Sequence, residues 1–130
     1  MAGDTMIFKS NETIKVLNYI KEKYDVEPAF LWEKFPETAA LRHWKTLKWF
    51  GVMMTVQKKK LGIADDGEVE ALVLKCDPIL IGTLIDGKGY LPAYHMNKEH
   101  WITVLLDGSV PENEIYDLID LSYSLTEKSR

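Results

Sequence analysis

A strand-like segment that is apolar on both of its sides, residues 49–56, constrains the fold of this chain most. It reads Trp-Phe-Gly-Val-Met-Met-Thr-Val and contains no charged residue. Successive side chains of a strand point to opposite faces of a sheet, and a strand that is apolar on both faces fits the interior of a sheet. We therefore predict a central strand that spans residues 48–56 and includes this apolar segment.

Four more strand-like segments accompany this one, and neighbouring segments are joined by short connections. They span residues 38–43, 69–76, 91–96 and 101–106. The connection between the first of them and the central segment is only Trp44-Lys45-Thr46-Leu47, which predicts a β-hairpin. Since short connections favour antiparallel pairing, we expect an antiparallel five-stranded sheet.

Three helices are indicated by capping residues and by apolar residues at helical spacing. The first spans residues 11–24, with Ser10 or Asn11 as its N-cap. The second begins at Asp77-Pro78 and ends near Gly87. The third follows a capping box, Ser109-Val110-Pro111-Glu112. Its core face is predicted to consist of Ile115, Leu118, Ile119, Ser122 and Leu125.

The order helix, three strands, helix, two strands, helix predicts a two-layer α+β domain whose helices cover one face of the sheet. No repeat, low-complexity tract or linker interrupts the sequence, so residues 1–130 are expected to form a single domain. In the third strand, residues 72, 74 and 76 are expected to face the helices. Ala71 and Val73 would then lie on an open sheet face that is not very polar, which is a candidate surface for association.

The charge of the chain is unevenly distributed. The formal net charge is −4, yet residues 41–64 contain six basic residues and no acidic one. A basic hairpin with interleaved tryptophans can follow a phosphate backbone while its rings stack against bases. Alternatively, the lysines only protect a sheet edge from aggregation and the tryptophans belong to the core. The six basic residues are Arg42, Lys45, Lys48, Lys58, Lys59 and Lys60.

A second candidate contact region surrounds the connection before the last strand. Its residues are Lys75, His95, Lys98 and His100. The two histidines could also begin a metal site, but a zinc site needs three or four ligands and the sequence supplies no obvious third except Glu99 or Asp107. No nucleophile motif or phosphate-binding loop accompanies them. We therefore expect no catalytic residues, no metal and no cofactor, and a segment that is structural or binds a polyanion.

Several strings in the second half of the chain resemble the MmcQ/YjbR family. They are Lys75-Cys76-Asp77-Pro78, the run from Pro92 to Trp101, the run from Leu106 to Pro111, and the run from Leu118 to Tyr123. Members of this family are small cytoplasmic bacterial proteins described as DNA-binding, with a fold similar to type III secretion chaperones. The resemblance implies this YjbR-like fold, with the hairpin from Arg42 to Val56 as one DNA-contacting wing.

The remaining features indicate where such a protein works. Residues 1–6 lack the pattern of a secretion signal, and no apolar run approaches the ~18 residues of a membrane span. The single cysteine, Cys76, is expected to be buried and inert. The sequence thus favours a cytoplasmic, non-enzymatic protein that binds DNA weakly and without sequence preference. The alternative is a homodimerising or chaperone-like module that binds a protein partner through the open sheet face.

Overall fold

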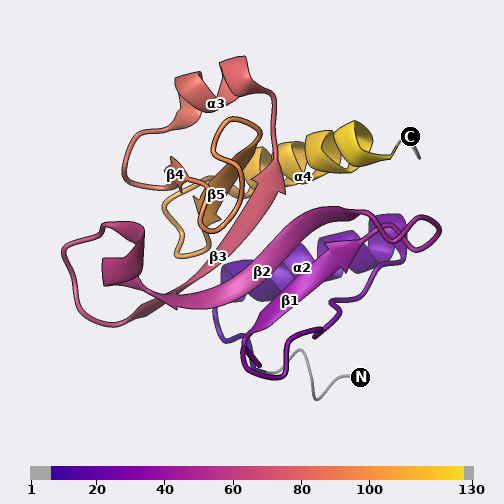
Figure 1. Ribbon diagram of the computed structural model, residues 1–130, viewed down its shortest axis with the longest axis horizontal. Helices are drawn as coiled ribbons and strands as arrows, with labels where there is room; N and C mark the ends of the chain where they lie inside the picture. The colour runs from indigo at the N-terminus through magenta and orange to yellow at the C-terminus, as the bar shows by residue number, and fades with distance from the viewer. Residues whose placement is uncertain (1–6, 128–130) are drawn as a thin grey trace.

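The computed structural model describes residues 7–127. Residues 128–130 lie outside this part of the chain, as do residues 1–6, on which the expectation about a secretion signal rests. The elements follow the predicted order (Figure 1). They are α2 (Asn11–Tyr24), β1 (Thr38–Arg42), β2 (Trp49–Gln57), the 3-10 turn η1 (Lys58–Leu61), β3 (Glu68–Lys75), α3 (Pro78–Leu84), β4 (Tyr90–Pro92), β5 (Trp101–Leu105) and α4 (Glu112–Thr126). Within residues 7–127, no helix is long and apolar enough to cross a membrane.

The five strands form one antiparallel sheet in the order β1-β2-β3-β5-β4, which confirms the predicted α+β fold. β2 has a neighbour on each side, as its two apolar faces predict, although β3 is the middle strand. After β3 the chain passes through α3 to the edge strand β4 and then returns to β5 between them.

α2 and α4 cover one face of the sheet, as Figure 1 shows. Ile20 of α2 and Ile119 of α4 are fully buried there against Leu72 and Leu74 of β3. Cys76 belongs to the same cluster and is buried, as predicted. Burial of this kind contributes about 1.5–3 kcal/mol for each large aliphatic side chain, so this layer stabilises the fold most.

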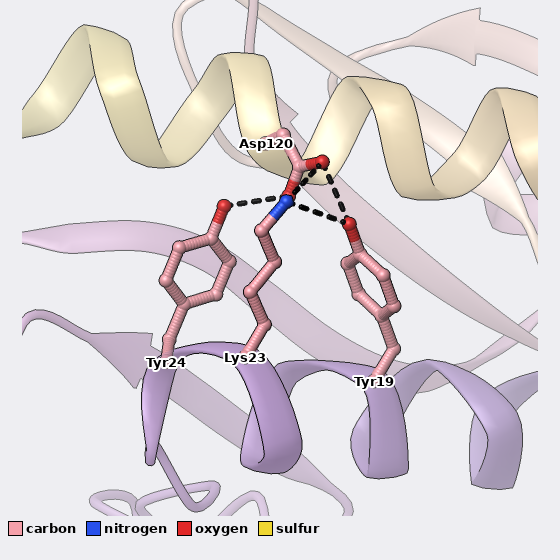
Figure 2. A network of polar contacts seen from close by, with 4 residues as sticks. All are labelled: Tyr19, Lys23, Tyr24 and Asp120. Carbon is pink, nitrogen blue, oxygen red and sulfur yellow. Dashed lines mark hydrogen bonds and ion pairs between the residues drawn. The ribbon is translucent and has the colours of Figure 1, made fainter.

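A polar network joins the two helices at the surface of this layer (Figure 2). The hydroxyls of Tyr19 and Tyr24 donate hydrogen bonds of 2.6 and 2.5 Å to the Asp120 carboxylate. The ammonium of Lys23 lies 2.9 Å from the same carboxylate. Partial burial acts to raise the pKa of Asp120, but the three donors outweigh it and hold that pKa below its usual value. The network fixes α2 against α4.

The start of α4 differs from the prediction. Pro111 occupies the N-cap position and no side chain caps the helix, so the predicted capping box does not form. The hydroxyl of Ser109 instead donates to the Asp107 carboxylate, which also accepts the backbone N–H of Ser109. At the other end of the helix, Leu125 is exposed and Thr126 takes the buried position.

The sequence also predicted α3 and β4 to be longer than they are. α3 ends at Leu84 rather than near Gly87. β4 ends at Pro92 rather than at residue 96, because the next residues leave the ladder. The N–H of Tyr94 bonds to the Thr103 side chain, and His95 has a φ of 63°, which a continuing strand does not allow. The polypeptide therefore turns away from β5 immediately after β4.

The sequence predicted that the second sheet face is open, but in the structure side chains cover it. Ala71 and Val73 are fully buried in a cluster of their own. The side chains that cover this cluster come from the segment that begins at η1, from the β4–β5 loop and from the sheet itself. They are Trp49, Leu61, Ile63, Tyr94, Met96 and Trp101. Because α2 and α4 lie on the other side, we call this surface the helix-free face.

Candidate nucleic-acid interface

Two basic and two aromatic side chains alternate on the helix-free face, close to the β1–β2 hairpin. Arg42 pairs with Trp49, and Lys75 pairs with Trp101. Residues paired across strands point to the same face, and both tryptophans pack against the cluster on the helix-free face. The Lys75 ammonium lies 5.7 Å from the centroid of the Trp101 ring. We call these four residues the basic-aromatic row.

A β-bulge brings Trp49 to this face. The register shifts between Leu41 and Arg42, so that β2 contains one extra residue there. Phe50 packs against the helices while Val52 packs on the opposite side, although strict alternation would place both on one face. The bulge thus directs Phe50 towards the helices and Trp49 towards the helix-free face.

Ser122 of α4 supports the sheet at this irregular position. Its hydroxyl accepts a hydrogen bond of 2.9 Å from the N–H of Lys75. The same hydroxyl donates to the carbonyl of Phe50. One buried side chain from the helix layer therefore joins β2 to β3 next to the bulge, directly behind the basic-aromatic row.

An apolar groove of about 610 Å³ continues from Trp49 along the helix-free face. Its walls include Trp32, Phe35, Met54 and Tyr94. The rings of Trp32 and Trp49 meet edge to face with their centroids 5.4 Å apart. The volume lies within the range of small-ligand pockets, and Trp49 belongs both to the groove and to the basic-aromatic row.

The segment between α2 and β1 supplies one wall of the groove. Backbone hydrogen bonds of 2.9 Å in both directions between Ala29 and Ala40 attach this segment to the sheet. The N–H of Phe35 then bonds to the carbonyl of Trp32, and the N–H of Thr38 bonds to the carbonyl of Phe35. These turns hold Phe35 in an exposed position, with 62% of its surface accessible.

The β4–β5 loop supplies the opposite wall, and its polar residues have a structural role as well. The Asn97 side chain accepts hydrogen bonds from the N–H groups of Glu99 and His100. The carbonyl of His100 accepts the N–H of Cys76, which connects the loop to the end of β3. His95 lines the groove, whereas Lys98 and His100 are exposed outside it. The prediction that this segment has a structural role is thus confirmed for Asn97.

The basic residues of segment 41–64 do not form one patch. The hairpin tip and η1 lie at opposite ends of β2 (Figure 1), which at nine residues is about 30 Å long. At η1, the Lys59 ammonium lies 3.0 Å from Asp66, and that of Lys58 lies 4.0 Å from Asp65. The six basic residues of this segment therefore fall into two separate groups. Arg42, Lys45 and Lys48 form the hairpin group, close to Lys75, and Lys58, Lys59 and Lys60 form the η1 group.

The remaining candidates for chemistry are distributed over the molecule. His43 is buried and hydrogen-bonds through Nε2 to the Thr126 hydroxyl, far along the chain from His95. Burial raises the pKa of the Cys76 thiol, which disfavours the reactive thiolate. Among residues 7–127, no group of three or more His, Cys, Asp or Glu side chains could hold a metal ion.

The sequence did not point to three residues of the groove, Trp32, Phe35 and Tyr94. For Trp32 and Phe35 the available signal was the segment Phe30-Leu31-Trp32-Glu33-Lys34-Phe35, which is rich in aromatic residues and lies outside any predicted strand or helix. A segment of this kind in a loop has to pack against some part of the fold or remain exposed.

A family model described as YjbR matches residues 21–125, which include both walls of the groove and the basic-aromatic row. The chain belongs to the YjbR family. A Bacillus subtilis relative named "Uncharacterized protein YyaQ" is 46% identical over 112 residues, covering 86% of this chain and 95% of the relative. The "Uncharacterized protein YjbR" of Escherichia coli is 59% identical, but over only 32 residues, 25% of this chain and 27% of the relative.

Solved structures have the same fold as this chain. A crystal structure of a Pseudomonas syringae protein is similar with a TM-score of 0.83 and 45% identity, covering 87% of this chain and 97% of that one. A Deinococcus radiodurans protein described with a DUF419 domain has a TM-score of 0.67 and 26% identity, covering 88% and 78%. These structures show the fold, and a fold by itself does not determine a function.

Proposed function

We propose that this chain is a non-enzymatic nucleic-acid-binding protein that holds its ligand on the helix-free face of the sheet. The observation that carries the proposal is the basic-aromatic row, in which Arg42 and Lys75 alternate with Trp49 and Trp101 across neighbouring strands. Guanidinium and ammonium groups bind phosphates, and tryptophan rings beside them offer surfaces on which bases stack.

The local charge supports this position for the interface, although the whole chain is acidic. The hairpin group, together with Lys75, places four basic residues in or beside the row. Lys58 and Lys59, by contrast, lie next to Asp65 and Asp66, which lowers their value for phosphate binding. The proposal therefore centres the interface on the row rather than on η1.

The test is a titration of fluorescently labelled oligonucleotides at about 50 and 200 mM salt. We expect binding that weakens with salt, and we expect the double variant Arg42→Glu/Lys75→Glu to weaken it at least about tenfold at 50 mM. The control variant Lys15→Glu/Lys88→Glu changes the net charge equally on the surface away from the row. If wild type does not bind at 50 mM salt, or if both variants weaken binding equally, the proposal is wrong.

A second candidate function is association with a protein partner or a second copy of this chain through the same face. The apolar lining of the groove and the exposed ring of Phe35 favour it. Sedimentation velocity over a range of concentrations tests whether the chain self-associates. A dimer that Phe35→Glu converts to a monomer would support association, whereas a monomer at all concentrations would exclude self-association.

A further inference from the structure

We infer that the nucleic acid bound by this face is single-stranded, with unpaired bases seated in the apolar groove. This inference rests on the proposed function and names its substrate class. The groove adjoins the basic-aromatic row at Trp49, so a strand whose phosphates contact Arg42 and Lys75 can direct its bases between the groove walls.

The chemistry of the groove selects against a duplex. Its walls are mainly aromatic and aliphatic side chains, including Trp32, Phe35 and Tyr94. A duplex presents phosphates and polar base edges to a protein, while its base faces are stacked on one another. Aromatic rings at the bottom and sides of a groove can stack only on bases that have left a duplex or never belonged to one.

The charges around the groove are also suited to a single strand. Arg42 and Lys75 lie near the Trp49 end of the groove. At the far end, Lys60 and Glu68 line the groove, where Glu68 pairs with Gln57 at the end of β2. A strand that follows the groove would pass two cations at the Trp49 end, then apolar walls, and then Lys60 together with the Glu68 carboxylate at the far end. About three phosphate contacts on a single strand predict a slope of log K against log salt of about −2, which is shallow.

The experiment compares three labelled ligands of equal length with the full chain: oligothymidylate, oligouridylate and a mixed-sequence DNA duplex, each 12 nucleotides or base pairs. We expect at least one of the single strands to bind about tenfold or more tighter than the duplex at the same salt. Equal or tighter binding of the duplex would overturn the inference and leave the proposed function standing. Absence of binding to all three would instead overturn the proposed function.

Two variants locate the stacking. Phe35→Ala removes an exposed ring from the groove, and Trp44→Ala removes an equally exposed ring, 66% accessible, from the hairpin tip outside it. We expect Phe35→Ala to weaken single-strand binding about fivefold or more and Trp44→Ala to change it less than about twofold. The reverse ranking would place the bases at the hairpin tip and contradict the inference.

A fluorescence measurement needs no substitution within the groove. In a Trp44→Phe background, the remaining tryptophans are Trp32, Trp49 and Trp101, which belong to the groove or the row. Stacking of bases on these rings should quench their emission when the single strand is added and leave it unchanged with the duplex. Saturable binding of the single strand without quenching would contradict the inference.

Discussion

The backbone N–H of Lys75 donates a hydrogen bond of 2.9 Å to the hydroxyl of Ser122 on α4. The side chain of Lys75 lies over Trp101 on the opposite face of the sheet. Through this one contact, a buried residue of the helix layer holds the backbone of a residue whose side chain belongs to the basic-aromatic row. The stability of the fold and the geometry of the candidate interface are connected at this position.

Replacing Ser122 tests that connection. Ser122→Ala leaves the N–H of Lys75 and the carbonyl of Phe50 without their partner, and we expect a loss of about 1–3 kcal/mol in the free energy of unfolding. Urea denaturation followed by circular dichroism measures it. Ser124→Ala, on the exposed side of the same helix, is the matched control. Equal stability of the two variants would show that the bridge does not stabilise the sheet.

The buried histidine predicts a dependence of stability on pH. Burial is the main cause that lowers the pKa of His43 below its ordinary value of about 6.5. Since the unfolded chain then binds more protons than the folded one, this residue reduces stability as the pH falls below about 6.5 towards the folded-state pKa.

Unfolding curves of wild type and of His43→Gln between pH 7.5 and 5 test this effect. The variant is expected to be less stable at pH 7.5, because it disturbs the contact with Thr126, and to lose less stability on acidification. His100→Gln, at an exposed position, is the matched control variant. A His43→Gln slope as steep as that of wild type would contradict the prediction.

The carboxylate between the two helices predicts a further loss of stability as the pH falls. The pKa of Asp120 is lowered by its three donors, so its contribution to stability is complete above the unfolded pKa of about 3.9 and is lost as the pH falls through the folded one. Asp120→Asn should cost about 1–3 kcal/mol at pH 7 and flatten the acid limb of the stability curve.

Thermal or chemical unfolding between pH 7 and 3 measures the Asp120 contribution. Asp117→Asn, at an exposed position of α4, is the control. It should change the free energy of unfolding at pH 7 by no more than about 0.5 kcal/mol. If the acid limb of Asp120→Asn matches that of wild type, the network of Figure 2 does not stabilise the charged form.

The acidic residues beside η1 should restrain nucleic-acid binding. Neutralising them in Asp65→Asn/Asp66→Asn releases Lys58 and Lys59 from the ion pairs that the structure shows. We expect tighter binding at about 50 mM salt, by less than about tenfold because exposed pairs are weak, and little change at 200 mM. Weaker binding of the variant at low salt would contradict the electrostatic account.

The sequence predicted the layers of this fold better than it predicted the interface. The bounds of α2, the antiparallel pairing and the inward direction of Leu72 and Leu74 follow from local capping and from alternation, which neighbouring residues determine. The bulge at Phe50 could not be predicted, because it depends on pairing with β1 and on Ser122, which is 72 residues away. For this reason the direction of Trp49 was not predictable either.

The distribution of charge was readable in the sequence, but its arrangement in space was not. Arg42 and Lys58 belong to one basic segment, yet β2 separates them by almost its full length. Lys75 lies far from Arg42 along the chain and comes close only because β3 pairs with β2. Residues that strand pairing brings together carry no common signal in a single sequence, so the basic-aromatic row emerges only from the fold.

The most direct test of the central claim is a ¹H–¹⁵N NMR titration of the labelled chain with oligothymidylate at low salt. The account predicts shifts of the indole N–H signals of Trp49 and Trp101 and of the backbone signals around Arg42, Lys75 and Tyr94. The amides of α2 and the outer side of α4 should remain unchanged. Shifts concentrated on those helices or on η1, or no shift at saturating ligand, would contradict the placement of the interface on the helix-free face.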